Sequence, residues 1–349
     1  MHSHRVTSIL ASFSLFFSTA VFAQTGTNVG AAAAASKPLN PDMSINFLGV
    51  ARMYSGFALQ EAEMQFIADV DPYFRANALF AVSKNATTGE YGIAPEEIFF
   101  ETISIPSLTV KAGKFKAALT RHNLLHSHAF PFISAPIVNT ELLGDEGLNN
   151  AGISAAALVP LPWFSEFTLQ GFTNSSTPFN SGNSGDWIGV AQFRNLWDLN
   201  DDLTLEFNLS GAQGKNSYAG KTNIVASDLI FKWRPAVGGK YQALIWQSEF
   251  LSGTIQGKPS DDSVDGWASW LQYQFAQRWW AQARYDMTGM SAATRANQKK
   301  RLSFLVGFFP SEFSGFRLEY GRTEQIATTD HALALQFNIS IGAHPAHAY

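Results

Sequence analysis

The stretch that decides the fold is His331-Ala-Leu-Ala-Leu-Gln-Phe-Asn-Ile-Ser-Ile341. Its large apolar residues occupy every second position from 333 to 341, and smaller or polar residues occupy the positions between them. Side chains of a β-strand alternate between the two faces of a sheet, so this stretch predicts a strand with one apolar face and one polar face. A closed barrel of many such strands can meet lipid on its outside and water on its inside.

The same alternation recurs along nearly the whole chain. Between 203 and 210 the odd positions are Leu or Phe, and the even positions are Thr, Glu, Asn and Ser. This period, punctuated by turn-forming residues, predicts about sixteen strands. They are expected at 43–53, 57–70, 73–84, 95–105, 107–117, 151–159, 164–173, 187–196, 203–212, 223–234, 240–251, 264–275, 278–288, 299–309, 315–324 and 331–342.

The predicted connections alternate between two kinds. One kind is short and rich in Pro, Gly, Asn or Asp, whereas the other is mostly longer and polar, and the longest link is 118–150. Short periplasmic turns and long extracellular loops are typical of outer-membrane barrels. We therefore predict an all-β fold, a transmembrane antiparallel β-barrel with both ends of the barrel segment on the periplasmic side.

The first residues have the features of a secretory signal peptide. Residues 1–23 combine a weakly basic start, a short apolar stretch and the small-residue cleavage sequence Ala20-Val-Phe-Ala23. Residues 24–41 contain an alanine run and two prolines without any strand pattern. We expect a flexible periplasmic linker there, which leaves 42–349 for the barrel.

Composition narrows the class of protein further. The chain has 349 residues, no cysteine, 13% aromatic residues and 15% charged residues, with a formal net charge of −4. The lack of cysteine excludes a disulfide framework and thiolate metal sites. The charge gives no indication of a nucleic-acid partner. Many aromatic and few charged residues favour a barrel whose outer face has outer-membrane lipid as its partner.

Several stretches carry a resemblance to a known family. They are Leu59-Gln-Glu-Ala-Glu63, Asp71-Pro-Tyr73, Lys111-Ala-Gly-Lys-Phe115, Arg121-His-Asn-Leu-Leu-His-Ser-His128, Leu143-Gly-Asp-Glu-Gly-Leu148, Pro160-Leu-Pro-Trp163, Pro310-Ser-Glu-Phe313 and Gly342-Ala-His-Pro-Ala-His347. Together they resemble a family of Gram-negative outer-membrane porin-like proteins, some of whose members are labelled zinc-regulated TonB-dependent outer-membrane protein. The third of these stretches is also similar to phosphate-selective porins.

The resemblance implies a porin, in which the third extracellular loop folds into the lumen as it does in general porins. That loop corresponds to 118–150, whose many apolar residues suit packing against the inner wall. The TonB label does not fit, because a TonB-dependent transporter needs a barrel of about 22 strands with a plugged lumen.

The same link contains His122, His126 and His128. Imidazoles are suitable ligands for Zn²⁺, Cu²⁺ or Ni²⁺, so these residues are candidate metal ligands and zinc is the candidate cofactor. The alternative is that the histidines only hydrogen-bond the loop to the barrel wall.

If the apolar faces point outward, charged residues of both signs point into the lumen. Opposite charges at a constriction can bias which ions enter, although such residues can also serve only to line and hydrate the wall. The candidate pore-lining or constriction residues are Glu61, Glu63, Arg75, Lys114, Lys116, Arg121, Arg284, Asp286 and Arg317.

These features favour a passive diffusion channel for small hydrophilic solutes or ions, and the size of the barrel is compatible with a homotrimer. Two alternatives remain: a zinc-linked binding or uptake protein, and a plugged structural barrel without conductance. We expect no enzyme. Ser127 beside two histidines and the carboxyl pair Asp261-Asp262 are weak catalytic candidates, because neighbours in a sequence usually point apart and no histidine lies near the pair.

Overall fold

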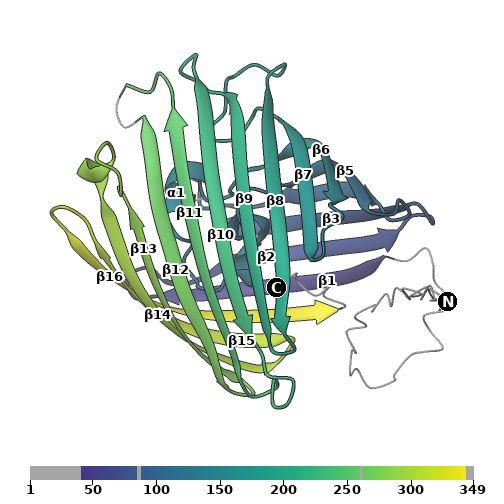
Figure 1. The fold of residues 1–349 in the computed structure, drawn as a ribbon. Coiled ribbons are helices and arrows are strands. Elements are labelled where there is room, and N and C mark those ends of the chain that lie inside the picture. Colours follow the sequence, from purple (N-terminus) through teal and green to yellow (C-terminus); the bar gives the residue numbers. More distant parts are fainter. Residues whose placement is uncertain (1–40, 85–87, 260–261, 343–349) are drawn as a thin grey trace, which may run out of the picture. The chain divides into compact units, whose positions relative to one another are not determined.

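The computed structural model describes residues 41–84, 88–259 and 262–342, which form a closed antiparallel β-barrel (Figure 1). The predicted signal peptide, almost all of the predicted linker and the last residues of the chain lie outside the described residues. Within the described residues, none of the helices has the length and hydropathy needed to span a membrane.

Sixteen strands pair in chain order, and β1 closes the ring by pairing with β16. The prediction of an all-β barrel is confirmed. The strands are β1 (Asp42–Arg52), β2 (Gly56–Asp69), β3 (Phe74–Lys84), β4 (Tyr91–Thr102), β5 (Leu108–Lys116), β6 (Asn149–Leu158), β7 (Phe164–Thr173), β8 (Trp187–Asn200), β9 (Leu203–Lys215), β10 (Lys221–Trp233), β11 (Ala243–Ile255), β12 (Ser263–Ala276), β13 (Trp279–Thr288), β14 (Lys299–Ser311), β15 (Ser314–Glu324) and β16 (Thr329–Gly342).

The two faces of the wall have opposite character, as the alternation predicts. In β9, Phe207 and Leu209 are exposed, while the polar residues Glu206, Asn208 and Ser210 are buried. A water-soluble sandwich would bury the apolar face and expose the polar one. The observed arrangement therefore points the apolar face outward and the polar face into the barrel.

Two β-bulges interrupt the regular pairing among the first four strands. The register between β1 and β2 shifts so that Gln60 has no partner in β1. The register between β3 and β4 shifts in the same way, which leaves Glu96 unpaired beside Pro95. Proline is tolerated at such a bulge, so β4 begins at Tyr91, four residues before the predicted start at 95.

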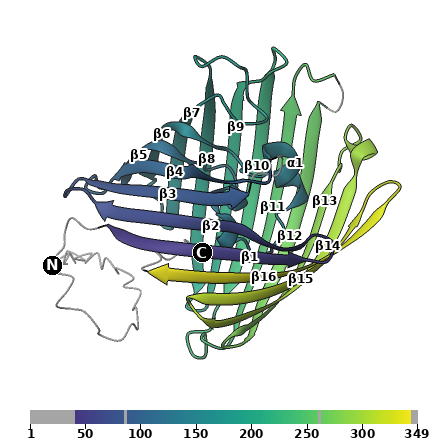
Figure 2. The same cartoon turned by 180° about the vertical axis from the view of Figure 1, so that it is seen from behind.

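The link between β5 and β6 is the longest, and we call residues 117–148 the inner segment. It contains the short helices η2 (His122–Leu124), η3 (Ser127–Ala129) and α1 (Ile137–Leu143). Helix α1 packs against β11, β12 and β13 and lies within the ring of strands in both views (Figures 1 and 2). A fourth short helix, η4 (Arg295–Asn297), belongs to the link between β13 and β14.

Apolar side chains attach the inner segment to the inside of the wall. Leu119, Val138, Leu142 and Leu143 share a buried cluster with inward-facing residues of β7, β8, β10 and β11, among them Phe172, Ile188, Ile224 and Leu251. Close packing of α1 depends on glycine in the wall, because a Cβ at Gly253 would lie 2.5 Å from a methyl carbon of Leu142. Part of the space inside the barrel is therefore filled by an apolar core.

Candidate functional site

Carboxylates on the inner face of the wall hold the backbone of the inner segment. Each accepts a hydrogen bond from one or more backbone N–H groups, and such charge-assisted bonds are stronger than those between neutral groups. The donors and acceptors are Arg121 N to Asp228 (3.1 Å), His122 N to Glu249 (3.2 Å), Ile133 N to Glu319 (2.6 Å), Ser134 N to Glu319 (3.2 Å) and Ile137 N to Asp286 (3.1 Å).

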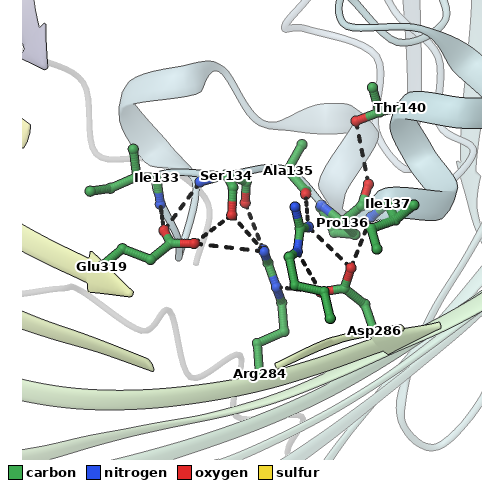
Figure 3. A network of polar contacts seen from close by, with 10 residues as sticks. Ile133, Ser134, Ala135, Pro136, Ile137, Thr140, Arg284, Asp286 and Glu319 are labelled. Atoms are coloured by element: carbon green, nitrogen blue, oxygen red, sulfur yellow. Dashed lines mark hydrogen bonds and ion pairs between the residues drawn. The ribbon is translucent and has the colours of Figure 1, made fainter. Parts of the chain in front are cut away.

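A network of charges completes this attachment below residues 133–137 (Figure 3). The Arg284 guanidinium lies 2.8 Å from Asp286 and donates to the Ser134 carbonyl oxygen (2.6 Å). Arg301 lies 3.0 Å from Asp286 on the other side. Since Arg284 and Asp286 are at most 2% exposed, this is a buried network in which each charge is compensated by its neighbours.

Most of the predicted pore-lining residues therefore serve as anchors for the inner segment. Arg284 and Asp286 hold residues 134–137, and Arg317 donates to the carbonyl oxygen of Phe130 and to Gln336. Glu61 and Glu63 are also buried, at 8% and 3% exposed. These side chains face the inner segment, which separates them from open solvent.

Three other predicted pore-lining residues each lie in a different environment. Arg121 lies in the inner segment, with its guanidinium 3.5 Å from Glu206. Lys116 lines a small cavity beneath the inner segment together with His122. Arg75 pairs with Asp69 at 2.7 Å, and both side chains are about half exposed.

Lys114 departs from the prediction that it faces the lumen. In the antiparallel register it lies opposite Ile98, whose side chain is 42% exposed. Directly opposed residues point to the same face of a sheet, so Lys114 belongs to the outer face. Its ammonium donates to the carbonyl oxygen of Pro95 (2.6 Å), a contact made accessible by the adjacent bulge.

The three candidate metal-ligating histidines do not converge on one point. The ring of His122 stacks on Phe130, with centroids 4.2 Å apart, and among the described residues it shares no carboxylate with the other two histidines. Burial lowers the pKa of His122 to about 3, and the positive charges of Arg284 and Lys116 act in the same direction. His122 is therefore a neutral residue of the packed inner segment rather than a partner of His126 and His128.

This burial makes the attachment of the inner segment dependent on pH. A histidine whose pKa is depressed in the folded state contributes stability above its unfolded pKa of about 6.5, and this contribution is lost as pH falls toward the folded value. We expect the inner segment to become more susceptible to limited proteolysis as pH falls from about 6.5 toward 4. In His122→Phe the onset should move to lower pH, and an identical profile in both proteins would contradict this role.

The other two histidines form a compact cluster with four carboxyl groups. His126 Nδ1 lies 2.6 Å from Glu96, and its Nε2 lies 3.1 Å from Glu97. His128 pairs with Glu63, and the Ser127 hydroxyl between the histidines donates to Glu61. The carboxylate–histidine cluster, as we name it, thus consists of Glu61, Glu63, Glu96, Glu97, His126 and His128.

The protonation of His126 reflects these neighbours. Burial lowers the pKa of its imidazole, but the hydrogen bonds to Glu96 and Glu97 outweigh burial and raise the pKa to about 9. Ser127, the weak catalytic candidate, donates to Glu61, and the histidines on either side of it pair with other carboxylates. Of the candidate pair Asp261-Asp262, Asp261 lies outside the described residues.

Sequence reasoning missed Glu96 and Glu97 as site residues. Two adjacent strand residues normally point to opposite faces, so at most one of them was expected inside. The bulge at Glu96 breaks the alternation and lets both side chains reach His126. The proline before the pair is the only local signal of that irregularity in the strand.

No family model matches the chain. An uncharacterised protein of Aquifex aeolicus (strain VF5) is 26% identical over 340 residues, covering 84% of this chain and 70% of that protein. OmpF of Salmonella typhi, in a complex with daunomycin, has a TM-score of 0.61 at 11% identity and covers 87% of this chain and 98% of its own.

Two further solved structures of outer-membrane proteins also resemble this barrel. An anion-selective porin from Comamonas acidovorans has a TM-score of 0.58 at 9% identity, covering 86% of this chain and 98% of its own. A loop-deletion mutant of OmpT, an outer membrane protein of Vibrio cholerae, has a TM-score of 0.60 at 7% identity and covers 86% and 99%. The zinc-regulated TonB-dependent label finds no support among them. What these likenesses establish is that the chain has the barrel fold of outer-membrane porins.

Proposed function

We propose that the protein is an outer-membrane porin through which small hydrophilic solutes or ions diffuse passively. The observation that carries this proposal is the inner segment, which is attached to polar side chains on the inside of a closed ring. A constriction built inside a polar-lined barrel is what a size-selective channel requires. The bore supplies the aqueous path, and the inner segment limits its width.

Two pairs of oppositely charged side chains stay partly exposed inside the barrel. Arg75 lies beside Asp69, and Lys111 lies 3.9 Å from Glu101, with side chains 29% and 25% exposed. Neighbouring charges of opposite sign largely cancel at a distance, particularly at physiological ionic strength. These two pairs should therefore contribute little to the charge selectivity of the proposed channel.

The location and assembly are part of the same proposal. Residues 1–23 direct export and are removed, 24–41 remain as a periplasmic linker, and outer-membrane lipid covers the apolar outer face. A trimer form of OmpT from Vibrio cholerae has a TM-score of 0.59 with this chain. A homotrimer is proposed here by analogy, and it can be detected by cross-linking and by migration in unheated detergent gels.

The test is planar-bilayer recording of the refolded mature chain. We expect stepwise conductance, because a water-filled path past the inner segment carries ions whenever a barrel inserts. Swelling of proteoliposomes in sugars of increasing size should then show a sharp upper limit.

Silence in both measurements would replace the proposal with the plugged structural barrel. The apolar core between the inner segment and β7–β11 is the specific observation in favour of that alternative. Conductance that is blocked by micromolar Zn²⁺ would instead favour a zinc-linked binding or uptake protein.

A further inference from the structure

We infer that the carboxylate–histidine cluster binds a first-row divalent transition-metal ion through Glu63, Glu96 and His126. One potential ligand atom from each of these residues lies within 4.8 Å of the others. The three come from β2, β4 and the inner segment, which are far apart in the sequence. Metal binding would therefore join the inner segment directly to the wall of the barrel.

The spacing of the ligand atoms is close to what such an ion needs. Bonds of about 2.0–2.2 Å to nitrogen and oxygen in a tetrahedral site place ligand atoms roughly 3.5 Å apart. The potential ligand atoms of Glu63, Glu96 and His126 all lie within 4.8 Å of one another, and His126 Nδ1 lies 2.6 Å from Glu96. Side-chain shifts of about an ångström would bring them to this spacing.

The many carboxyl groups of the cluster favour binding of a cation. Four carboxyl groups face two imidazoles, so acidic groups outnumber basic ones in the cluster. Lys116 adds a positive charge that acts on Glu96 and His126, but it is not bonded to the cluster through its side chain among the described contacts. Buried charge of one sign is costly unless it is neutralised, and a divalent ion does this directly.

Glu63 provides an observation that is independent of this charge count. Its side chain is 3% exposed, and while one carboxylate oxygen pairs with His128, the other (Oε1) has no hydrogen-bond donor among the residues that the structure describes. An unsatisfied buried carboxylate oxygen costs free energy in an otherwise well-bonded interior. A metal ion between Glu63, Glu96 and His126 would satisfy it.

The surrounding groups also orient the proposed ligands. With Nδ1 of His126 turned toward Glu96, its Nε2 lies 3.1 Å from Glu97, which fixes the ring. A carboxylate on the far nitrogen of a ligating imidazole is the usual support in metal sites. Imidazole with carboxylate suits Zn²⁺ and neighbouring transition metals better than Ca²⁺ or Mg²⁺, which prefer oxygen ligands alone.

The experiment is a calorimetric titration of the refolded, EDTA-stripped chain with ZnCl₂, followed by visible absorption spectra with Co²⁺. Every protein carries His344→Asn and His347→Asn, so that imidazoles near the chain end cannot contribute. We expect one ion per chain with a micromolar or lower dissociation constant, and a Co²⁺ spectrum typical of low coordination number. Binding should be lost in His126→Gln and in Glu63→Gln.

Matched variants separate the site from general effects. His122→Gln removes another buried histidine of the same segment and should leave affinity unchanged. Glu97→Gln should weaken binding by roughly 10- to 100-fold while keeping the Co²⁺ spectrum, as expected of a residue that positions His126. A shift between heated and unheated mobility in detergent gels confirms that each variant is a folded barrel.

The outcomes decide the inference without reference to conductance. Stoichiometric binding that depends on His126 and Glu63 but not on His122 supports the site. An unchanged affinity in folded His126→Gln, or no binding by the folded parent protein, overturns it. Because binding is measured on the closed barrel itself, a channel that fails to conduct leaves this result unaffected.

Discussion

Replacing residues 118–147 with a short Asn-Gly turn should raise the single-channel conductance several-fold while leaving the barrel closed. The ends of the excised stretch are already adjacent, since Ala117 N donates to the carbonyl oxygen of Leu148 (2.9 Å). A tight turn can therefore join β5 to β6 as a simple hairpin. Conductance should rise because the inner segment lies inside the ring and obstructs the bore. Planar-bilayer recording of the variant beside the parent measures the change.

A second truncation, which leaves the inner segment unchanged, serves as the control. Replacing 289–298, the link between β13 and β14, with a similar turn shortens an outer connection and leaves the anchors of the inner segment in place. This variant should keep the parent conductance. If removal of 118–147 changes conductance no more than this control does, then the inner segment is not the constriction and the proposed mechanism is wrong.

The truncation should also lower stability. Inward-facing Phe172, Ile224 and Leu251 would lose their apolar cover and face water at a cost of about 25 cal/mol per Å² of newly exposed surface. The hydrogen-bonded ladders of the closed ring do not depend on that cover, so the fold should persist.

The sequence predicts the wall of this barrel well because the information is local. Alternation along a single strand is visible without knowing its neighbours, as in β9 and β16, where exposed apolar residues alternate with inward polar ones. The predictions are less accurate where the strand pairing is irregular. The bulge at Glu96 and the unexpected start of β4 depend on pairing with β3, which no single strand reveals.

The candidate site was predictable only in part, for the same reason. The chemistry of His126 and His128 identifies them as candidates. Their partners Glu63 and Glu96 lie in β2 and β4, and they meet the histidines only when the inner segment folds back. His122 was grouped with them by spacing alone. In the structure it stacks on Phe130, because the inner segment is not one continuous helix that would align positions 122 and 126.

The second large effect is expected at Asp286. In Asp286→Ala, two arginines, Arg284 and Arg301, would remain close together without the carboxylate that lies between them at 2.8 and 3.0 Å. Removing one partner of a buried ion pair typically costs about 3–5 kcal/mol, because a charge is left uncompensated. We expect a loss of this size in the free energy of unfolding, measured by guanidinium titration with tryptophan fluorescence in lipid vesicles.

An exposed Arg–Asp pair of the same barrel gives the matched control. Arg75 and Asp69 are also joined at 2.7 Å, but their side chains are 45% and 57% exposed. Exposed pairs contribute only about 0–1 kcal/mol, since water and salt replace the lost partner. Asp69→Ala should therefore change the free energy of unfolding far less than Asp286→Ala does, although the two pairs have the same chemistry.

Asp286→Asn separates charge from hydrogen bonding at the same position. In the parent protein the Ile137 N lies 3.1 Å from the Asp286 carboxylate. Asparagine keeps an oxygen that can accept this hydrogen bond, but it cannot neutralise Arg284 and Arg301. If charge compensation dominates, Asp286→Asn should lose most of the stability that Asp286→Ala loses. Near-parent stability would instead assign the role of Asp286 to its bond with the start of α1. Equal small losses in both variants and in Asp69→Ala would show that water reaches the network, and that the inner segment is held mainly by its apolar core.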